Sequence, residues 1–108
     1  MESLASDEIP YFEVTYLYRD ASNYKYWGSF KIRGVLALDE LRPHMLMNEY
    51  FVPEAVGIRC LTPSERNDDD HDLHEIVAIE PAVTDPYAFT AAELVMSFQR
   101  QNSIGWFR

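Results

Sequence analysis

Apolar and polar residues alternate along two neighbouring stretches near the start of the chain. In residues 11–18, one face of the alternation carries Phe12, Val14, Tyr16 and Tyr18. In residues 24–33, one face carries Tyr24, Tyr26, Phe30 and Ile32, and the other carries Lys25, Trp27, Ser29, Lys31 and Arg33. A two-residue period rich in aromatic and β-branched side chains predicts half-buried strands. The turn-forming residues 19–23 predict an antiparallel hairpin, in which Gly28 marks a bulge or a close backbone approach.

Two helices and a third strand are predicted further along. The first helix begins near Asp39 or Glu40, because Pro43 is tolerated only in the first turn, and continues to Met47. Residues 73–79 predict a strand that is apolar on both sides and therefore well covered. A capping-box pattern at Thr90 and Glu93 predicts a helix over residues 91–101. Its predicted buried stripe is Leu94, Val95 and Phe98, with Gln101 as a further candidate.

The predicted order of elements is therefore strand, strand, helix, strand, helix. We expect an α+β fold, with a small, mostly antiparallel three-stranded sheet and two helices packed on one face. Residues 1–9 are polar and acidic and are expected to be a flexible N-terminus, which leaves residues 10–108 as a single α+β domain. The aromatic pair Trp106 and Phe107 is expected to anchor the end of the chain against the core.

The net charge of the chain disfavours some classes of binding partner and favours others. The chain of 108 residues has 9 basic and 18 acidic residues, a formal net charge of −9. Such a domain repels phosphate backbones, so direct nucleic-acid binding is disfavoured, whereas a basic protein surface is attracted. The opposing view is that the charge only keeps the protein soluble. The single cysteine, Cys60, fits a reducing compartment, and the N-terminus has no signal-peptide pattern. We expect a cytoplasmic protein of a bacterium or a phage, with no membrane segment.

Acidic residues concentrate between positions 65 and 75. The candidate partner-binding residues there are Glu65, Asp68, Asp69, Asp70, Asp72 and Glu75. A calcium loop requires alternating carboxylates followed by glycine, but Asp68, Asp69 and Asp70 are consecutive and no glycine follows. Two interpretations remain beside weak calcium binding: an acidic patch that contacts a partner, and a solvated loop without one.

The same stretch contains two histidines, His71 and His74. Imidazoles beside carboxylates are ligands for a divalent transition metal. The spacing places both rings on one side of a helix, but on opposite faces of a strand. His44 is a possible third nitrogen ligand whose position the sequence does not fix. A metal site at His71 and His74 is therefore an alternative to a surface His71 and a structural His74, and no other cofactor is predicted.

Signals for catalysis are weak. The chain has four glycines and no nucleophile-elbow, phosphate-loop or dinucleotide-binding motif, so an enzyme is less favoured than a binding protein. Trp27 among Lys25, Lys31 and Arg33 is typical of single-stranded nucleic-acid platforms, but three cations are few in so acidic a chain. The tyrosines of the hairpin either pack in the core or form a protein-binding surface.

Three segments carry a resemblance: residues 18–25, residues 51–57 and the pair His74 and Glu75. Together they resemble a family of small, uncharacterised bacterial and mobile-element proteins over about residues 11–80. The resemblance implies a single cytoplasmic domain. It implies no activity and assigns no functional residue.

The favoured hypothesis is a small, acidic, non-enzymatic protein-interaction module. Its acidic segment would contact a basic surface on a protein partner, for instance as an inhibitor that competes with nucleic acid for that surface. The alternatives are the metal-binding protein described above and a homodimer held by the aromatic face of the hairpin or by Trp106 and Phe107.

Overall fold

The computed structural model describes residues 10–20, 24–62, 73–82 and 88–106. Within these ranges the long strands are β1 (Tyr11–Arg19), β2 (Lys25–Arg33) and β4 (His74–Ala82). Two strands of two residues each, β3 (Tyr50–Phe51) and β5 (Phe89–Thr90), complete the sheet. The helical elements are α1 (Leu38–Leu41), the 3-10 turns η2 (Arg42–His44) and η3 (Pro53–Val56), and the long helix α2 (Ala91–Ile104).

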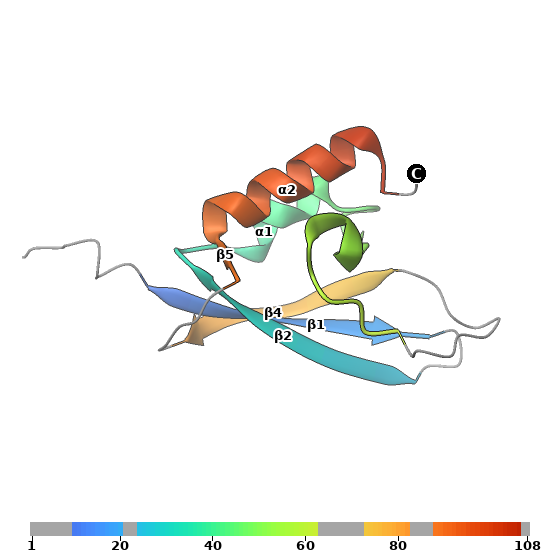
Figure 1. Cartoon of the computed structure of the whole chain (residues 1–108), viewed down its shortest axis with the longest axis horizontal. Coiled ribbons are helices and arrows are strands. Elements are labelled where there is room, and N and C mark those ends of the chain that lie inside the picture. The colour runs from blue at the N-terminus through green and yellow to red at the C-terminus, as the bar shows by residue number, and fades with distance from the viewer. Residues whose placement is uncertain (1–9, 21–23, 63–72, 83–87, 107–108) are drawn as a thin grey trace, which may run out of the picture.

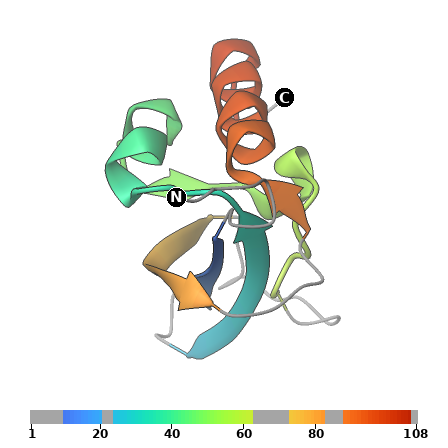
Figure 2. The ribbon, with the colours of Figure 1, turned by 90° about the vertical axis from the view of Figure 1, so that its left-hand side faces the viewer.

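The sheet is curled, has the strand order β3-β4-β1-β2-β5, and carries both helices over one face (Figures 1 and 2). The chain is therefore α+β, but the predicted three-stranded antiparallel sheet is wrong. There are five strands, and β5 pairs with β2 in parallel, opposite Ile32 and Arg33. Strands of two residues are too short to show a repeating alternation, so the pattern of the sequence could not reveal β3 or β5.

The core lies between the concave face of the sheet and α2. Three of the four residues predicted on the inward face of β1, Val14, Tyr16 and Tyr18, are buried, and Phe12 is half-buried. Leu17, on the other face, is buried as well. Aromatic rings pack between the sheet and α2. The centroids of the Phe51 and Phe98 rings lie 5.3 Å apart, and those of Phe98 and Trp106 lie 5.5 Å apart. Trp106 thus anchors the end of α2 as expected, whereas Phe107 lies outside the described residues.

The third long strand differs from its prediction. It runs over His74–Ala82 rather than residues 73–79, and its pairing with β1 shifts register between Thr15 and Tyr16. His74 and Ile76 are buried and Val77 is exposed, as simple alternation requires. Val77 is the extra residue, and beyond it Ile79, opposite Val14, faces the core together with Ile76. A strict two-residue alternation cannot anticipate the extra residue of a bulge.

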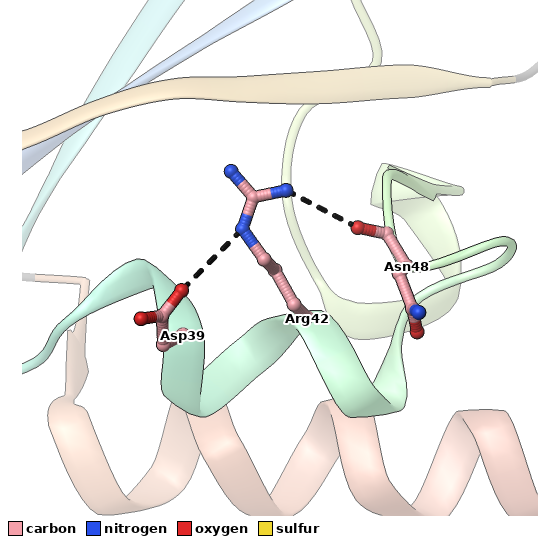
Figure 3. A network of polar contacts seen from close by, with 3 residues as sticks. All are labelled: Asp39, Arg42 and Asn48. Atoms are coloured by element: carbon pink, nitrogen blue, oxygen red, sulfur yellow. Dashed lines mark hydrogen bonds and ion pairs between the residues drawn. The ribbon is translucent and has the colours of Figure 1, made fainter.

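The helix predicted from Asp39 to Met47 is also shorter than expected. It is a single turn, α1, followed by η2 with Pro43 in its first turn, and the carboxylate of Glu40 accepts a hydrogen bond from the Ala37 N–H at 3.0 Å. Arg42 links α1 to the turn that follows η2. Its Nε lies 3.6 Å from Asp39 Oδ1, and its Nη1 donates to the Asn48 carbonyl at 3.4 Å (Figure 3). Proline prevents the regular helix from continuing.

The C-terminal helix confirms the capping prediction. The Thr90 hydroxyl accepts a hydrogen bond from the Glu93 N–H at 3.1 Å, and the Glu93 carboxylate accepts one from the Thr90 N–H at 2.9 Å. Leu94 and Phe98 are buried as expected, and the helix ends before Gly105, three residues later than predicted. No helix among the described residues is long and apolar enough to cross a membrane.

Candidate interaction surface

The first residues of β2 expose large aromatic side chains. Tyr24, which immediately precedes the strand, is 68% exposed, and Trp27 is 58% exposed. Tyr26 is also exposed, although the alternation groups it with the buried Ile32. The hairpin tyrosines therefore divide: Tyr16 and Tyr18 pack in the core, while Tyr24 and Tyr26 form a surface. Exposed aromatic side chains of this kind are frequent anchors of protein–protein contacts.

A row of rings connects this exposed surface to the core. The Tyr26 ring lies 5.8 Å from that of Tyr18 on β1, and Tyr18 lies 5.1 Å from the ring of His74 on β4. Tyr18 pairs with Tyr26 on one side and with His74 on the other, so the row crosses three neighbouring strands. The exposed end of β2 therefore lies two strands away from the first residue of β4.

His74 is fully buried, and its Nε2 accepts a hydrogen bond from the Leu61 N–H at 3.1 Å. An acceptor at Nε2 requires a free lone pair on that nitrogen, so the ring is neutral with its proton on Nδ1. This contact joins Leu61, which precedes the acidic segment (residues 65–75), to His74 near the end of that segment. It satisfies a buried backbone donor that would otherwise be costly to bury.

Tyr16 makes a second hydrogen bond between the sheet and residues 59–61, beside the one between His74 and Leu61. Its hydroxyl donates to the Arg59 carbonyl at 2.6 Å. Burial raises the pKa of Tyr16, because desolvation penalises the phenolate, and the nearby Arg59 opposes part of this effect. Leu61 also packs over Gly28, where an added Cβ would come within 2.8 Å of the leucine Cδ2. The pairing of β1 with β2 is regular through Gly28, so the predicted bulge is wrong, and the close approach there is made by side chains rather than by backbone.

Most of the predicted partner-binding residues fall outside the described part of the chain. Those residues are Glu65, Asp68, Asp69, Asp70 and Asp72, and the proposed metal ligand His71 is a sixth. Glu75 is described: it lies on β4, half-buried, between Leu17 of β1 and Tyr50 of β3. It lines a hollow of about 300 Å³ together with Arg19, Met47, Tyr50 and Leu73.

The described histidines occupy different surroundings. His74 sits among the rings of Tyr16, Tyr18 and Phe51, whereas His44 lies at the end of η2, 3.5 Å from Gln99 Nε2 on α2. Among the described residues, no group of three or more His, Cys, Asp or Glu side chains is arranged to hold a metal ion. Because His71 is outside those residues, the metal hypothesis stays a prediction.

Neither the Cys60 thiol nor the hollow beside α2 has the arrangement of a catalytic site. Cys60 is half-buried, with its Sγ 3.1 Å from the Thr62 hydroxyl. A hollow of about 430 Å³ lies between η3 and α2, and its carboxylate, Glu93, already caps the helix. Neither feature joins a nucleophile to a base, which is the arrangement that covalent catalysis needs.

The charge of the chain is divided unequally. Of its 18 acidic residues, half lie outside the described ranges, compared with two of its nine basic residues. The described part is therefore close to neutral, and most of the net charge belongs to the remaining segments. The most acidic of these, residues 63–72, connects Thr62 to Leu73, beside the contact between Leu61 and His74.

The sequence did not predict that Arg59 and Leu61, which precede the acidic segment, are hydrogen-bonded to the sheet. Nothing in the local pattern around Arg59 and Leu61 indicates that they contact Tyr16 and His74, since those partners are distant along the chain. A comparison with known proteins found no matching family model, no matching curated protein and no matching solved structure. The resemblance of residues 18–25 and 51–57 to uncharacterised bacterial proteins therefore stays a prediction.

Proposed function

We propose that the protein is a small, acidic, non-enzymatic interaction module that binds a protein partner through a basic surface of that partner. The observation that supports the proposal concerns residues that the structure describes: Leu61, which precedes the acidic segment, and His74 are hydrogen-bonded to each other. A row of rings runs from His74 to Tyr26, beside the exposed Tyr24 and Trp27.

Charge and aromatic area support the proposal in different ways. The carboxylates of the acidic segment accelerate the encounter with a basic surface and make it sensitive to salt. Tyr24 and Trp27 supply rigid apolar area at the same end of the sheet, which carries affinity after desolvation. A basic groove that normally holds nucleic acid is one surface of this kind, in which case the module acts as a competitor.

The test is capture of partners from native lysate, at low and at high salt, with three versions of the chain. The first is unmodified, and the second combines Asp68→Asn, Asp69→Asn and Asp70→Asn. The third is a matched control, Asp39→Asn with Glu54→Gln and Glu80→Gln, which removes three charges from exposed positions elsewhere in the fold.

We expect a basic partner that is released by salt, lost with the triple aspartate variant and retained with the control. Equal loss with both variants would mean that net charge alone drives the association. A partner that ignores salt and both sets of substitutions would contradict the proposal.

A further inference from the structure

Among the described residues, no strand pairs with one side of the backbone in the first half of β2. Near the ends of the strand, Tyr24 and Gly34 are paired with β1, through hydrogen bonds to Asp20 and Pro10. The carbonyl of Lys31, in contrast, points the other way and accepts from the Ala88 N–H at 2.8 Å. Because backbone groups alternate in direction along a strand, even-numbered residues face β1 and odd-numbered residues face outward.

In the part of the chain that the structure describes, the strand on the outward side, β5, pairs only with Ile32 and Arg33. Within that part, the outward groups of Lys25, Trp27 and Ser29 therefore lie on an open edge. The open stretch thus runs from Tyr24 to Phe30 and has Trp27 at its midpoint. Open edges of sheets pair readily with another extended chain.

We infer that this edge pairs with the same edge of a second copy, antiparallel about a two-fold axis at Trp27. This register is the one that uses the whole open stretch, because residues 24 and 30 then lie opposite each other. Lys25 of each copy faces Ser29 of the other, and Trp27 faces Trp27. Three outward residues on each copy, each with one N–H and one C=O, give about six hydrogen bonds between the copies.

Side chains complement each other in this register. The two exposed Trp27 rings meet, and Tyr24 lies opposite the half-buried Phe30 of the second copy, so apolar area is covered on both faces of the joined sheet. Lys25 lies opposite Ser29, whose hydroxyl donates to Glu13 at 2.9 Å. Each lysine is thereby placed beside an acidic residue of the other copy.

The neighbouring register is less favourable. Moving the two-fold axis by one residue, to Gly28, places Lys25 opposite Lys31 of the second copy, and like charges in facing positions destabilise a sheet. The joined edge is also short, so we expect a weak dimer that depends on protein concentration. This inference shares Tyr24 and Trp27 with the proposed function but does not involve the acidic segment. The two can therefore fail separately: the triple aspartate variant tests the acidic segment, and the two measurements below test the edge of β2.

Cross-linking reads the register directly. In a Cys60→Ser background, the single variants Lys25→Cys and Ser29→Cys each place a thiol on the same face of β2 and leave Trp27 in place. A short bismaleimide can span the ~5.5 Å between paired Cα atoms. It cannot span the roughly 14 Å between positions offset by four residues. The inference therefore predicts cross-linking in an equal mixture of the two variants, where residue 25 of one copy faces residue 29 of the other, and little cross-linking in either variant alone. Equal rates in the mixture and in the separate variants, or no cross-linking in the mixture, would overturn the register.

Sedimentation equilibrium provides a second, independent measurement on the unmodified chain. Over protein concentrations from about 1 μM to 1 mM, the apparent mass should rise from monomer towards dimer. Trp27→Lys, which places two lysines opposite each other, should remain monomeric, whereas Trp27→Tyr should still associate. A monomer at every concentration overturns the inference, as does dimerisation that Trp27→Lys leaves unchanged.

Discussion

The two halves of β2 have the same alternation of side chains but opposite surroundings. Phe30 and Ile32 lie under β5 and the start of α2, and the Phe30 ring packs edge-on against Phe89 at 5.7 Å. Trp27 and Tyr24, only a few residues earlier, remain exposed. An alternating pattern therefore specifies that a strand forms, but not which part of it another element covers. Exposed aromatic area next to an open edge is the feature that a binding surface would need.

The largest predicted effect separates the covered core from the exposed half of the strand. Phe98→Ala should lower the free energy of unfolding by about 3–5 kcal/mol, because it leaves a cavity beside Phe51 and Trp106. Trp27→Ala should change it by less than about 0.5 kcal/mol in the dilute monomer. Urea unfolding of both variants measures the difference. Similar losses would mean that Trp27 is packed as tightly as the core.

A smaller effect is predicted at the attachment of the acidic segment. His74→Phe keeps an aromatic ring but leaves the Leu61 N–H without its acceptor, which should cost about 1–3 kcal/mol. His74→Gln offers an amide oxygen and should recover part of this loss. Thermal unfolding compares the three proteins. Equal stability of His74→Phe and the unmodified chain would show that the contact contributes nothing.

At the covered end, the cap of α2 should contribute about 1 kcal/mol. Thr90→Ala removes the side chain that accepts from the Glu93 N–H, and loss of such a cap has about this cost. Ser103→Ala, at an exposed position in the last turn, is the matched control and should have almost no effect. Chemical unfolding of the two variants decides the point, and equal losses would contradict a specific cap.

Tyr16 should make stability depend on alkaline pH. Since its folded pKa is raised, the unfolded chain loses this proton first, and the free energy of unfolding should fall as pH rises above about 10. Tyr16→Phe should cost about 1 kcal/mol at neutral pH, through loss of the bond to Arg59. It should also reduce the alkaline decline. An unchanged pH profile of unfolding in Tyr16→Phe would assign that decline to other groups.

The sequence was most informative where contacts are local. The capping pair of Thr90 and Glu93, and the inward face of β1, follow from neighbours within a few residues. The short strands β3 and β5 and the register shift near Thr15 depend on pairing between distant segments, so local alternation could not predict them. The contact between Leu61 and His74 is of the same kind. This contact shows that His74, one of the two predicted metal ligands, is a buried acceptor of a backbone hydrogen bond. The metal hypothesis itself stays a prediction.

Amide hydrogen exchange along β2, measured at several protein concentrations, tests the open edge most directly. The amides of Tyr26 and Gly28 face β1 and should be protected at all concentrations. Those of Trp27 and Ser29 should exchange quickly in dilute solution and become protected as the concentration rises. Protection of Trp27 in dilute solution would mean that the chain itself covers the edge. Fast exchange at every concentration would mean that no second copy pairs with it.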